Sequence, residues 1–187
     1  MKIGIVYFSN RDITEKLVLS AISGIEENDC EVYTHRVSGK EIIEGRFENS
    51  SLNDHLGSCE AIIFASPTYM GGVSAQFKSF VDSTSEIWCK QEWEGKIAAG
   101  ITCGSALNGD QSSTLQYLVT FASQHGMIWV SLDSAFGHND HGINRLGCQL
   151  GVVAQTVNDE ADIIDLATAK YLGERVAKLV YRLNHEI

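Results

Sequence analysis

Apolar, β-branched runs alternate along the chain with segments in which apolar residues recur at helical spacing. The apolar runs cover residues 2–8, 30–37, 61–66, 96–103 and 127–132. Helical periodicity follows the first, third and fourth runs, and a polar stretch follows the second. Near-continuous apolar strands separated by helices are typical of a parallel sheet that is buried on both faces. The pattern therefore predicts an α/β doubly wound fold with five strands and helices on both faces of the sheet.

The last part of the chain predicts one more helix and an insertion. Apolar residues recur at helical spacing over residues 159–183, and residues 133–150 read as an extended, glycine-containing insertion. No linker, repeat or low-complexity segment divides the sequence. We expect a single domain over residues 1–187.

Composition and charge narrow the class of protein. The chain has 187 residues, of which 44% are hydrophobic and 20% charged, and its formal net charge is −10. This charge disfavours nucleic acids and anionic membranes as partners, so an anionic ligand must be held by a local device. The sequence shows neither a signal peptide nor an apolar run of membrane-spanning length, which predicts a cytoplasmic protein. The five cysteines are scattered without a C-x-x-C pair, so neither a disulfide framework nor a zinc site is expected.

Three loops follow the first, third and fourth predicted strands, at the sheet edge where doubly wound folds bind ligands. The first loop is SNRDIT (residues 9–14), the second is SPTYMGG (66–72), and the third is TCGSALNGD (102–110). In the first loop, Ser9 and Thr14 offer hydroxyl groups, and the helix that follows directs free N–H groups toward any bound anion. The loop lacks both the G-x-G-x-x-G glycines and a G-K-[ST] sequence, which leaves a terminal monophosphate as the expected ligand group.

The second and third loops offer a surface for a planar ring. Pro67 stiffens the exit of the third strand, glycines allow close approach of backbone, and Tyr69 and Met70 present a flat, polarisable surface. A turn that simply requires proline and glycine is the alternative for this loop. The third loop exposes backbone amides that suit the edge of a heterocycle.

The segments SPTYMGGVSAQFKSFVDSTSEIW and EGKIAAGITCGSALNGDQSSTLQYLVTFASQHGM carry a specific motif, P-T-x-x-G-x-x-S-x-Q-x-(K/R)-x-F-x-D followed by W, G-K-x-A and H-G-M. With these motifs, nearly the whole chain resembles the flavodoxin-like NAD(P)H:quinone oxidoreductases of the WrbA type. The resemblance implies a flavodoxin-like five-stranded sheet of order 2-1-3-4-5, non-covalent FMN, and two-electron reduction of quinones by NAD(P)H in a ping-pong sequence of hydride transfers. It also implies a homotetramer, and we expect a homo-oligomer, either a dimer or a tetramer.

The resemblance assigns the three loops to parts of FMN. The expected cofactor-binding residues are Ser9, Asn10, Arg11, Ile13 and Thr14 around the phosphate, Pro67, Thr68, Tyr69, Met70 and Gly71 at the isoalloxazine, and Cys103, Gly104, Ser105, Ala106, Leu107 and Asn108 on its pyrimidine side. Trp88 matches a family tryptophan that covers the flavin of a neighbouring subunit, and the alternative for it is a packed aromatic at a helix end. Gln124, beside His125, stands where the family has a histidine that faces the flavin. No side chain is expected to act as an acid or base, because the cofactor carries the redox chemistry.

Asp12 departs from the family, which has glycine there, and Arg11 replaces an aromatic residue. A carboxylate about 4 Å from a phosphate charge costs roughly 4 kcal/mol at an effective dielectric of 20, half of the roughly 8 kcal/mol of micromolar binding. D-I-T-E also reads as a capping box in which Asp12 occupies the phosphate position itself. Against this, Arg11 is placed to pair with Asp12 or with the phosphate, and Asp tolerates the backbone angles that glycine adopts.

Two alternatives to a quinone reductase stay open. One is a flavodoxin-like electron carrier or an FMN reductase for another acceptor, which the acidic surface suits. The other is a family member in which Asp12 has weakened or abolished FMN binding. A metal site at His138, Asp140 and His141, within GHNDHG, is disfavoured because no distant Cys or His has convincing spacing. The preferred interpretation is a solvated loop or an active-site lid, and in a lid His138 and His141 would meet substrate near the flavin.

Overall fold

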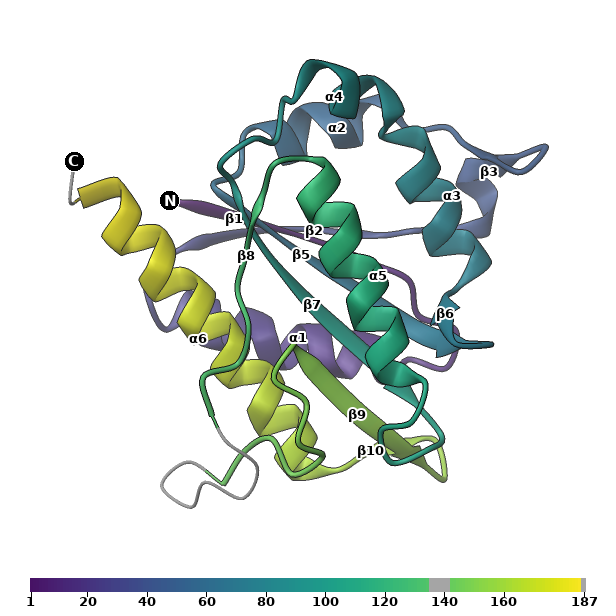
Figure 1. Cartoon of the computed structure of the whole chain (residues 1–187), viewed down its shortest axis with the longest axis vertical. Coiled ribbons are helices and arrows are strands. Elements are labelled where there is room, and N and C mark those ends of the chain that lie inside the picture. Colours follow the sequence, from purple (N-terminus) through teal and green to yellow (C-terminus); the bar gives the residue numbers. More distant parts are fainter. Residues whose placement is uncertain (135–141, 186–187) are drawn as a thin grey trace.

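A parallel sheet forms the centre of the computed structural model, which describes residues 1–134 and 142–185 (Figure 1). Its strands lie in the order β2-β1-β5-β7-β9. Their bounds are Glu31–Arg36 for β2, Lys2–Tyr7 for β1, Ala61–Tyr69 for β5, Ile97–Gly104 for β7 and Val152–Val157 for β9. This is the doubly wound, flavodoxin-like α/β fold with the expected 2-1-3-4-5 order of its five principal strands.

The fifth strand corrects the sequence prediction. Of the run at 127–132, only β8 (Ile128–Trp129) pairs with β7, opposite Ile97 and Ala98. The other end of β7 pairs instead with β9, which the prediction missed, and Ile101 lies opposite Val152. Two short segments therefore share one position in the sheet, because the chain leaves β7 after Trp129 and returns at Val152.

The return of the chain to the sheet is fixed by Asp165 of α6 (Ile163–His185). Its carboxylate accepts hydrogen bonds from Arg145 Nε and Nη2, at 2.8 and 2.7 Å, and from the Gln155 N–H at 3.0 Å. Asp165 is buried, and burial raises the pKa of its carboxyl while the Arg145 guanidinium opposes that shift. These bonds join the returning segment, β9 and α6 at one point.

Helices cover both faces of the sheet (Figure 1). One face packs α1 (Ile13–Glu26) and α6, and the other packs α2 (Ser50–Gly57), α3 (Ala75–Ser83), α4 (Ser85–Lys90) and α5 (Gln111–Gln124). The strands alternate accordingly: in β1, Ile3 and Ile5 lie in the core under α1 and α6, whereas Val6 lies in the core under the other helices. Burial on both faces explains why these strands read as continuous apolar runs.

Helices α1 and α6 lie in close contact because each contributes a glycine to the crossing. A β-carbon added at Gly24 would lie 2.2 Å from the Lys170 carbonyl oxygen, and one added at Gly173 would lie 2.1 Å from the Ala21 carbonyl oxygen. No real β-carbon approaches backbone so closely. The two glycines therefore set the distance between the helices.

The shorter elements refine the predicted boundaries. The polar stretch after β2 holds the 3₁₀ turn η1 (Gly39–Glu41), the hairpin strands β3 (Ile42–Ile43) and β4 (Arg46–Phe47), and α2. The helical segment predicted after the third apolar run is divided at Thr84 into α3 and α4. The last helix begins at Ile163 rather than at 159, because β10 (Glu160–Ala161) first pairs antiparallel with β9. No helix in the described part of the chain is long and apolar enough to cross a bilayer.

Candidate functional site

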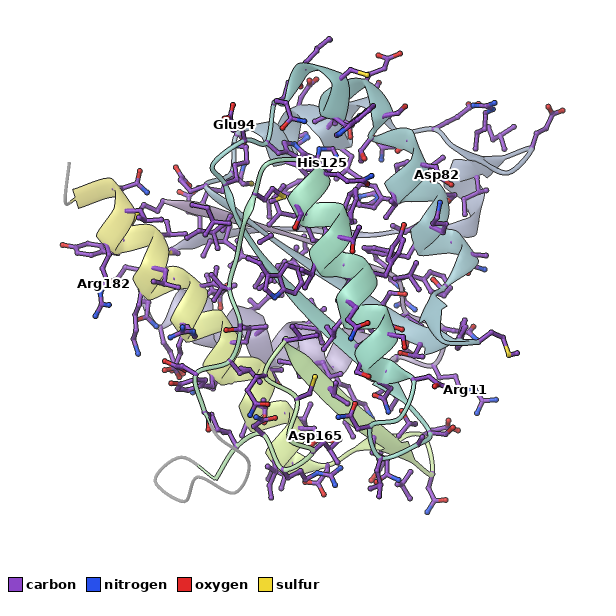
Figure 2. All side chains as sticks on the ribbon, in the orientation of Figure 1. Arg11, Asp82, Glu94, His125, Asp165 and Arg182 are labelled. Carbon is purple, nitrogen blue, oxygen red and sulfur yellow. The ribbon has the colours of Figure 1, made fainter. Side chains whose placement is uncertain are left out.

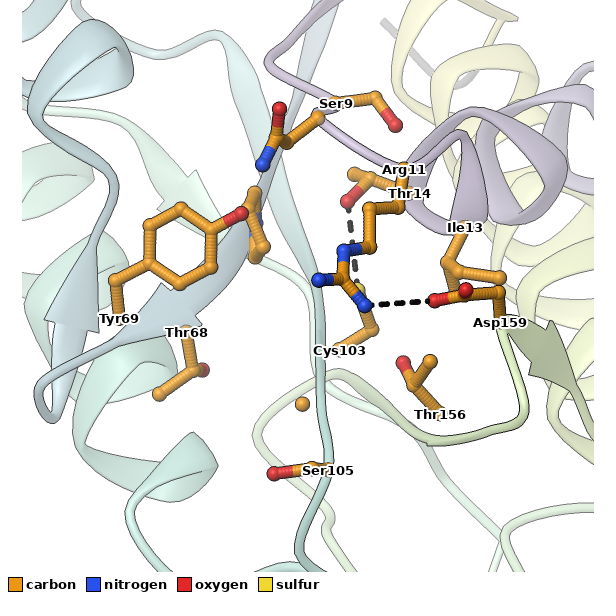
Figure 3. Close-up of a pocket in the computed structure, with 13 residues that line it drawn as sticks. Ser9, Arg11, Ile13, Thr14, Thr68, Tyr69, Cys103, Ser105, Thr156 and Asp159 are labelled. Carbon is orange, nitrogen blue, oxygen red and sulfur yellow. Dashed lines mark hydrogen bonds and ion pairs between the residues drawn. The ribbon is translucent and has the colours of Figure 1, made fainter.

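A cavity of about 410 Å³ lies at the carboxyl ends of β1, β5 and β7, and we call it the strand-end cavity (Figure 3). All three predicted loops contribute to it. Its predicted lining residues are Ser9, Asn10, Arg11, Ile13, Thr14, Pro67, Thr68, Tyr69, Cys103, Gly104 and Ser105, and Thr156 and Asp159 complete it. The volume is within the range of roughly 300–1,000 Å³ that small-molecule sites occupy.

The first loop leads directly into the N-terminus of α1. Asp12 adopts a left-handed conformation, with φ 59°, as expected where Asp replaces glycine. It makes no side-chain cap, so the predicted capping box is wrong; the Glu15 N–H instead lies 3.4 Å from Ser9 Oγ. Because the first N–H groups of a helix have no acceptor within the helix, this end of α1 is suited to an anion.

The Asp12 carboxylate is held by Arg36, at the end of β2. Arg36 Nη2 donates to Asp12 Oδ1 and to the Ser9 carbonyl oxygen, each at 2.8 Å, and Nη1 donates to Glu15 Oε2 at 2.8 Å. Partial burial disfavours the Arg36 charge, but its bonds to Asp12 and Glu15 leave its pKa raised. The register explains the contact, since Arg36 lies opposite Tyr7 in the β1–β2 pair.

Glu15 has a second donor, the hydroxyl group of Tyr7. Tyr7 Oη donates to Glu15 Oε1 at 2.9 Å. Burial, together with the Glu15 carboxylate, raises the pKa of Tyr7 to about 12. The tyrosine therefore stays a neutral donor throughout the physiological pH range, and Glu15 is fixed from both sides.

Arg11 pairs with Asp159 rather than with Asp12. Its Nη1 lies 3.1 Å from Asp159 Oδ1, and both side chains are largely exposed (Figure 3). Asp159 occupies the tip of the β9–β10 hairpin, where Asn158 and Asp159 both have positive φ, as the tightest hairpin turns require. The hairpin thereby brings a carboxylate to the mouth of the cavity.

The second loop forms the opposite side of the cavity. Tyr69 and Gly72 pair across the hairpin between β5 and β6 (Gly72–Val73), and Met70 at its tip has φ 49°. The side chain of Met70 is fully exposed, and Tyr69 is half-exposed with its hydroxyl group directed toward the cavity (Figure 3). A flat aromatic surface is therefore available beside the site.

Buried hydroxyl groups hold this side of the cavity in place. Thr68 Oγ1 lies 2.8 Å from Oγ1 of both Thr102 and Thr114, and Thr102 donates to the Ser66 carbonyl oxygen at 2.8 Å. Since Thr102 uses its proton for Ser66, Thr68 donates to Thr102 and accepts from Thr114. The network joins β5, β7 and α5 beneath the site and fixes the exit of β5.

The third loop divides between two cavities. Cys103 is buried and its sulfur lies 3.4 Å from Thr14 Oγ1; burial raises the pKa of the thiol, which remains protonated. Met70, Gly71 and Ala106 line an adjoining cavity of about 500 Å³, which shares Thr68, Gly104 and Ser105 with the strand-end cavity and adds Asp110 and Gln111. Leu107 is exposed, and the Asn108 side chain donates to the Leu146 carbonyl oxygen at 3.3 Å, so these two line neither cavity.

Trp88 and Gln124 lie away from the strand-end cavity of their own chain. They line a cavity of about 310 Å³ with Tyr117 and His125, which we call the helix-end cavity. It lies at the carboxyl end of α5, whose 14 residues span roughly 20 Å. Gln111, at the amino end of α5, lines the cavity that adjoins the strand-end cavity. Figure 2 shows the same separation between His125 and Arg11.

Three residues that matter here escaped prediction. Thr156 and Asp159 belong to the missed strand and its hairpin, and Arg36 lies far from the loops in sequence. The predicted adjacency of the first two strands was the one signal that places Arg36 beside the first loop. The residues of GHNDHG at 138–141 lie outside the described part of the chain, and within that part no cluster of three or more His, Cys, Asp or Glu side chains has the geometry of a metal site.

Comparison with known proteins agrees with this arrangement. The model of the NADPH-dependent FMN reductase family matches residues 1–141. The chain belongs to this family. Among curated relatives, "Flavodoxin FldP" of Pseudomonas aeruginosa is 35% identical, over 96% of this chain and 97% of that protein. An "NAD(P)H dehydrogenase (quinone)" of Archaeoglobus fulgidus is 32% identical, over 97% and 98%.

A solved structure of a similar protein shares both the fold and the sequence similarity. The WrbA-like flavodoxin from Agrobacterium tumefaciens superimposes with a TM-score of 0.75 at 32% identity, covering 97% of this chain and 98% of that one. The resemblance to WrbA-type proteins is thereby confirmed. The relatives carry two kinds of name, flavodoxin and quinone dehydrogenase, so family membership leaves the exact activity of this chain to be inferred from its site.

Proposed function

We propose that the protein is an FMN-dependent NAD(P)H:quinone oxidoreductase. The observation that carries the proposal is the strand-end cavity, where the N-terminus of α1, the half-exposed Tyr69 and the loop after β7 converge. These three features match the phosphate, the planar ring and the polar edge of a flavin mononucleotide. Membership of the NADPH-dependent FMN reductase family, and relatives named NAD(P)H dehydrogenase (quinone), support the donor and the acceptor.

The residues present fit FMN. Ser9, Thr14 and the N-terminus of α1 would hold its phosphate, with the Asp12 carboxylate already occupied by Arg36. Tyr69 would lie against the isoalloxazine, and the backbone of Cys103, Gly104 and Ser105 would meet its pyrimidine edge. Bound FMN supplies the two-electron redox chemistry. The chain contributes binding and orientation, and the buried, protonated Cys103 takes no part as a nucleophile.

The test begins with the purified protein, which we expect to be yellow, to release FMN on denaturation, and to reduce benzoquinone with NADH or NADPH. Thr14→Val removes a buried hydroxyl group at the phosphate end and should lower flavin content. Thr120→Val is the matched control, because Thr120 lies on the exposed face of α5 and its hydroxyl group donates only to Gln116. FMN-loaded protein that does not oxidise NAD(P)H in the presence of benzoquinone would overturn the proposal.

An electron carrier is the second candidate. It is favoured by the relative named flavodoxin and by the net charge of −10, which suits a basic protein partner. The two functions differ in the one-electron steps of the bound flavin. Well-separated one-electron potentials, together with no turnover of NAD(P)H, would establish a carrier instead of a two-electron enzyme.

We include a homo-oligomer in the proposed function. Trp88 is half-exposed and lies with Gln124 at the helix-end cavity, so in this arrangement the two reach a flavin only if it belongs to another copy of the chain. Light scattering should then show a dimer or a tetramer. Trp88→Ala should change the Michaelis constant for quinone without lowering the FMN content of the protein. A fully active monomer would rule out both the homo-oligomer and the proposed role of Trp88.

A further inference from the structure

Arg36, on β2, makes three hydrogen bonds to the first loop and the first turn of α1. It donates to the Ser9 carbonyl oxygen, the Asp12 carboxylate and the Glu15 carboxylate, all at 2.8 Å. Ser9 lines the strand-end cavity, whereas Arg36 itself does not. The Arg36 side chain is 40% exposed, so these bonds are not simply those of a buried core residue. The three acceptors lie together where the first loop enters α1, so Arg36 holds the conformation of this junction.

Among the three acceptors, Asp12 is the one whose position bears on the binding of an anion. It lies at the N-cap position of α1, where an aspartate side chain ordinarily accepts from the second or third N–H group of the helix. A carboxylate in that position would occupy the place of an anion and repel a phosphate group. In the structure it makes no such bond and is turned to Arg36 instead.

We propose that Arg36 is the positioning residue that makes this loop able to hold a phosphate, by keeping the Asp12 carboxylate off the N-terminus of α1. The inference rests on the proposed binding of FMN and assigns the specificity for the phosphate end of the ligand. Where glycine would leave an anion site open without assistance, this chain has a carboxylate and a guanidinium that must remain paired. The ability of the first loop to bind a phosphate group therefore depends on Arg36 of the neighbouring strand.

The bond from Arg36 to Glu15 does not explain an effect of Arg36 on phosphate binding. Its carboxylate keeps a second donor, Tyr7 Oη at 2.9 Å, when Arg36 is removed. Asp12 has no other partner in the described part of the chain and would be released to cap the helix. Loss of Arg36 should accordingly be harmful because of Asp12 and only slightly because of Glu15.

The test is a double-mutant cycle read out by titration of the apoprotein with FMN and, separately, with riboflavin, which lacks the phosphate. Arg36→Ala should weaken FMN binding about tenfold or more and leave riboflavin binding within about twofold of wild type. Asp12→Asn, which removes the charge while tolerating positive φ, should restore most of the FMN affinity when combined with Arg36→Ala. The matched control, Glu15→Gln combined with Arg36→Ala, should not restore it.

Two other outcomes of these titrations would contradict the inference. Equal losses for FMN and riboflavin would show that Arg36 only stabilises the fold, and failure of Asp12→Asn to restore affinity would show that Asp12 is not the repelling group; either overturns the inference while the proposed function stands. Thermal unfolding of each variant separates misfolding from loss of binding. The double variant Asp12→Asn with Arg36→Ala lacks the same contacts to Ser9 and Glu15 as Arg36→Ala alone, so a difference in FMN affinity between the two reflects Asp12. Wild-type apoprotein that binds no FMN would overturn both the inference and the proposed function.

Discussion

The Arg11 guanidinium and the Asp159 carboxylate meet at 3.1 Å across the mouth of the strand-end cavity, although 148 residues separate them in sequence. Their pairing joins the first loop to the β9–β10 hairpin. Both groups are largely exposed, so the pair stabilises the protein by about 1 kcal/mol at most. In the proposed complex with FMN, the phosphate group would compete with Asp159 for the same cation.

Asp159→Asn should therefore tighten FMN binding about two- to fivefold, because it releases Arg11 and removes a negative charge from the mouth of the cavity. Titration by flavin fluorescence quenching measures the change, which should shrink at high salt. Glu27→Gln is the matched control, since it breaks the exposed pair between Glu27 and Lys170, away from the site. An unchanged or weakened affinity in Asp159→Asn would show that Arg11 is not a phosphate ligand.

Tyr69→Ala should lower the affinity for FMN and for riboflavin alike, by about tenfold, because the aromatic surface is lost from one side of the cavity. Tyr69→Phe keeps the ring and should bind both flavins nearly as wild type does. The visible spectrum of the bound flavin reports the same contact. A loss confined to FMN would place Tyr69 at the phosphate instead of the ring.

Gly173→Ala should destabilise the protein by about 2 kcal/mol or more, because the added methyl group meets the Ala21 carbonyl oxygen at the crossing of α1 and α6. The midpoint of urea unfolding measures this. Gly57→Ala serves as the control, since nothing lies within 4 Å of a β-carbon at Gly57. Equal stability of the two variants would show that the helices separate at little cost.

Stability should fall in acid because of His125. Its Nε2 lies 3.0 Å from Thr84 Oγ1, which donates to the Val81 carbonyl oxygen, so Nε2 carries the proton and donates to Thr84. Burial lowers the pKa of His125 from 6.5 to about 4. The unfolded chain therefore takes up a proton below about pH 6.5 that the folded protein accepts only near pH 4.

This contribution to stability is fully present above pH 6.5 and is lost as the pH falls toward 4, by up to about 3 kcal/mol. Urea unfolding at a series of pH values measures the loss. His125→Gln keeps a donor for Thr84 and should flatten the profile between pH 6.5 and 4. A profile of the same slope in that variant would assign the acid sensitivity to other groups.

The sequence was informative where periodicity and position coincide. The strands β1, β5 and β7 are buried on both faces and so appear as apolar runs, and the loops that follow them converge because parallel strands end at one edge. Eleven of the residues expected at the cofactor indeed line one cavity. Periodicity failed at the fifth strand, where the run at 127–132 contributes only Ile128 and Trp129 to pairing.

The rest of the site depends on contacts that a local pattern does not contain. D-I-T-E has the composition of a capping box, but the cap is lost because Arg36, 24 residues away, offers the Asp12 carboxylate a charged donor. Asp159 reaches the cavity only because β9 and β10 form a hairpin beside β7. Register and strand order decide both contacts, and each is a property of the assembled sheet.

The position shared by β8 and β9 gives each end of β7 a separate partner. β8 aligns with the start of β7, and β9 aligns with its end and is tied to α6 through Asp165. The described residues that connect the two segments are anchored as well, since Arg145 donates to Asp165 and the Asn144 side chain donates to the Ser134 carbonyl oxygen. The β9–β10 hairpin is therefore held at the cavity through β9 and Asp165, and its place does not depend on the pairing of β8.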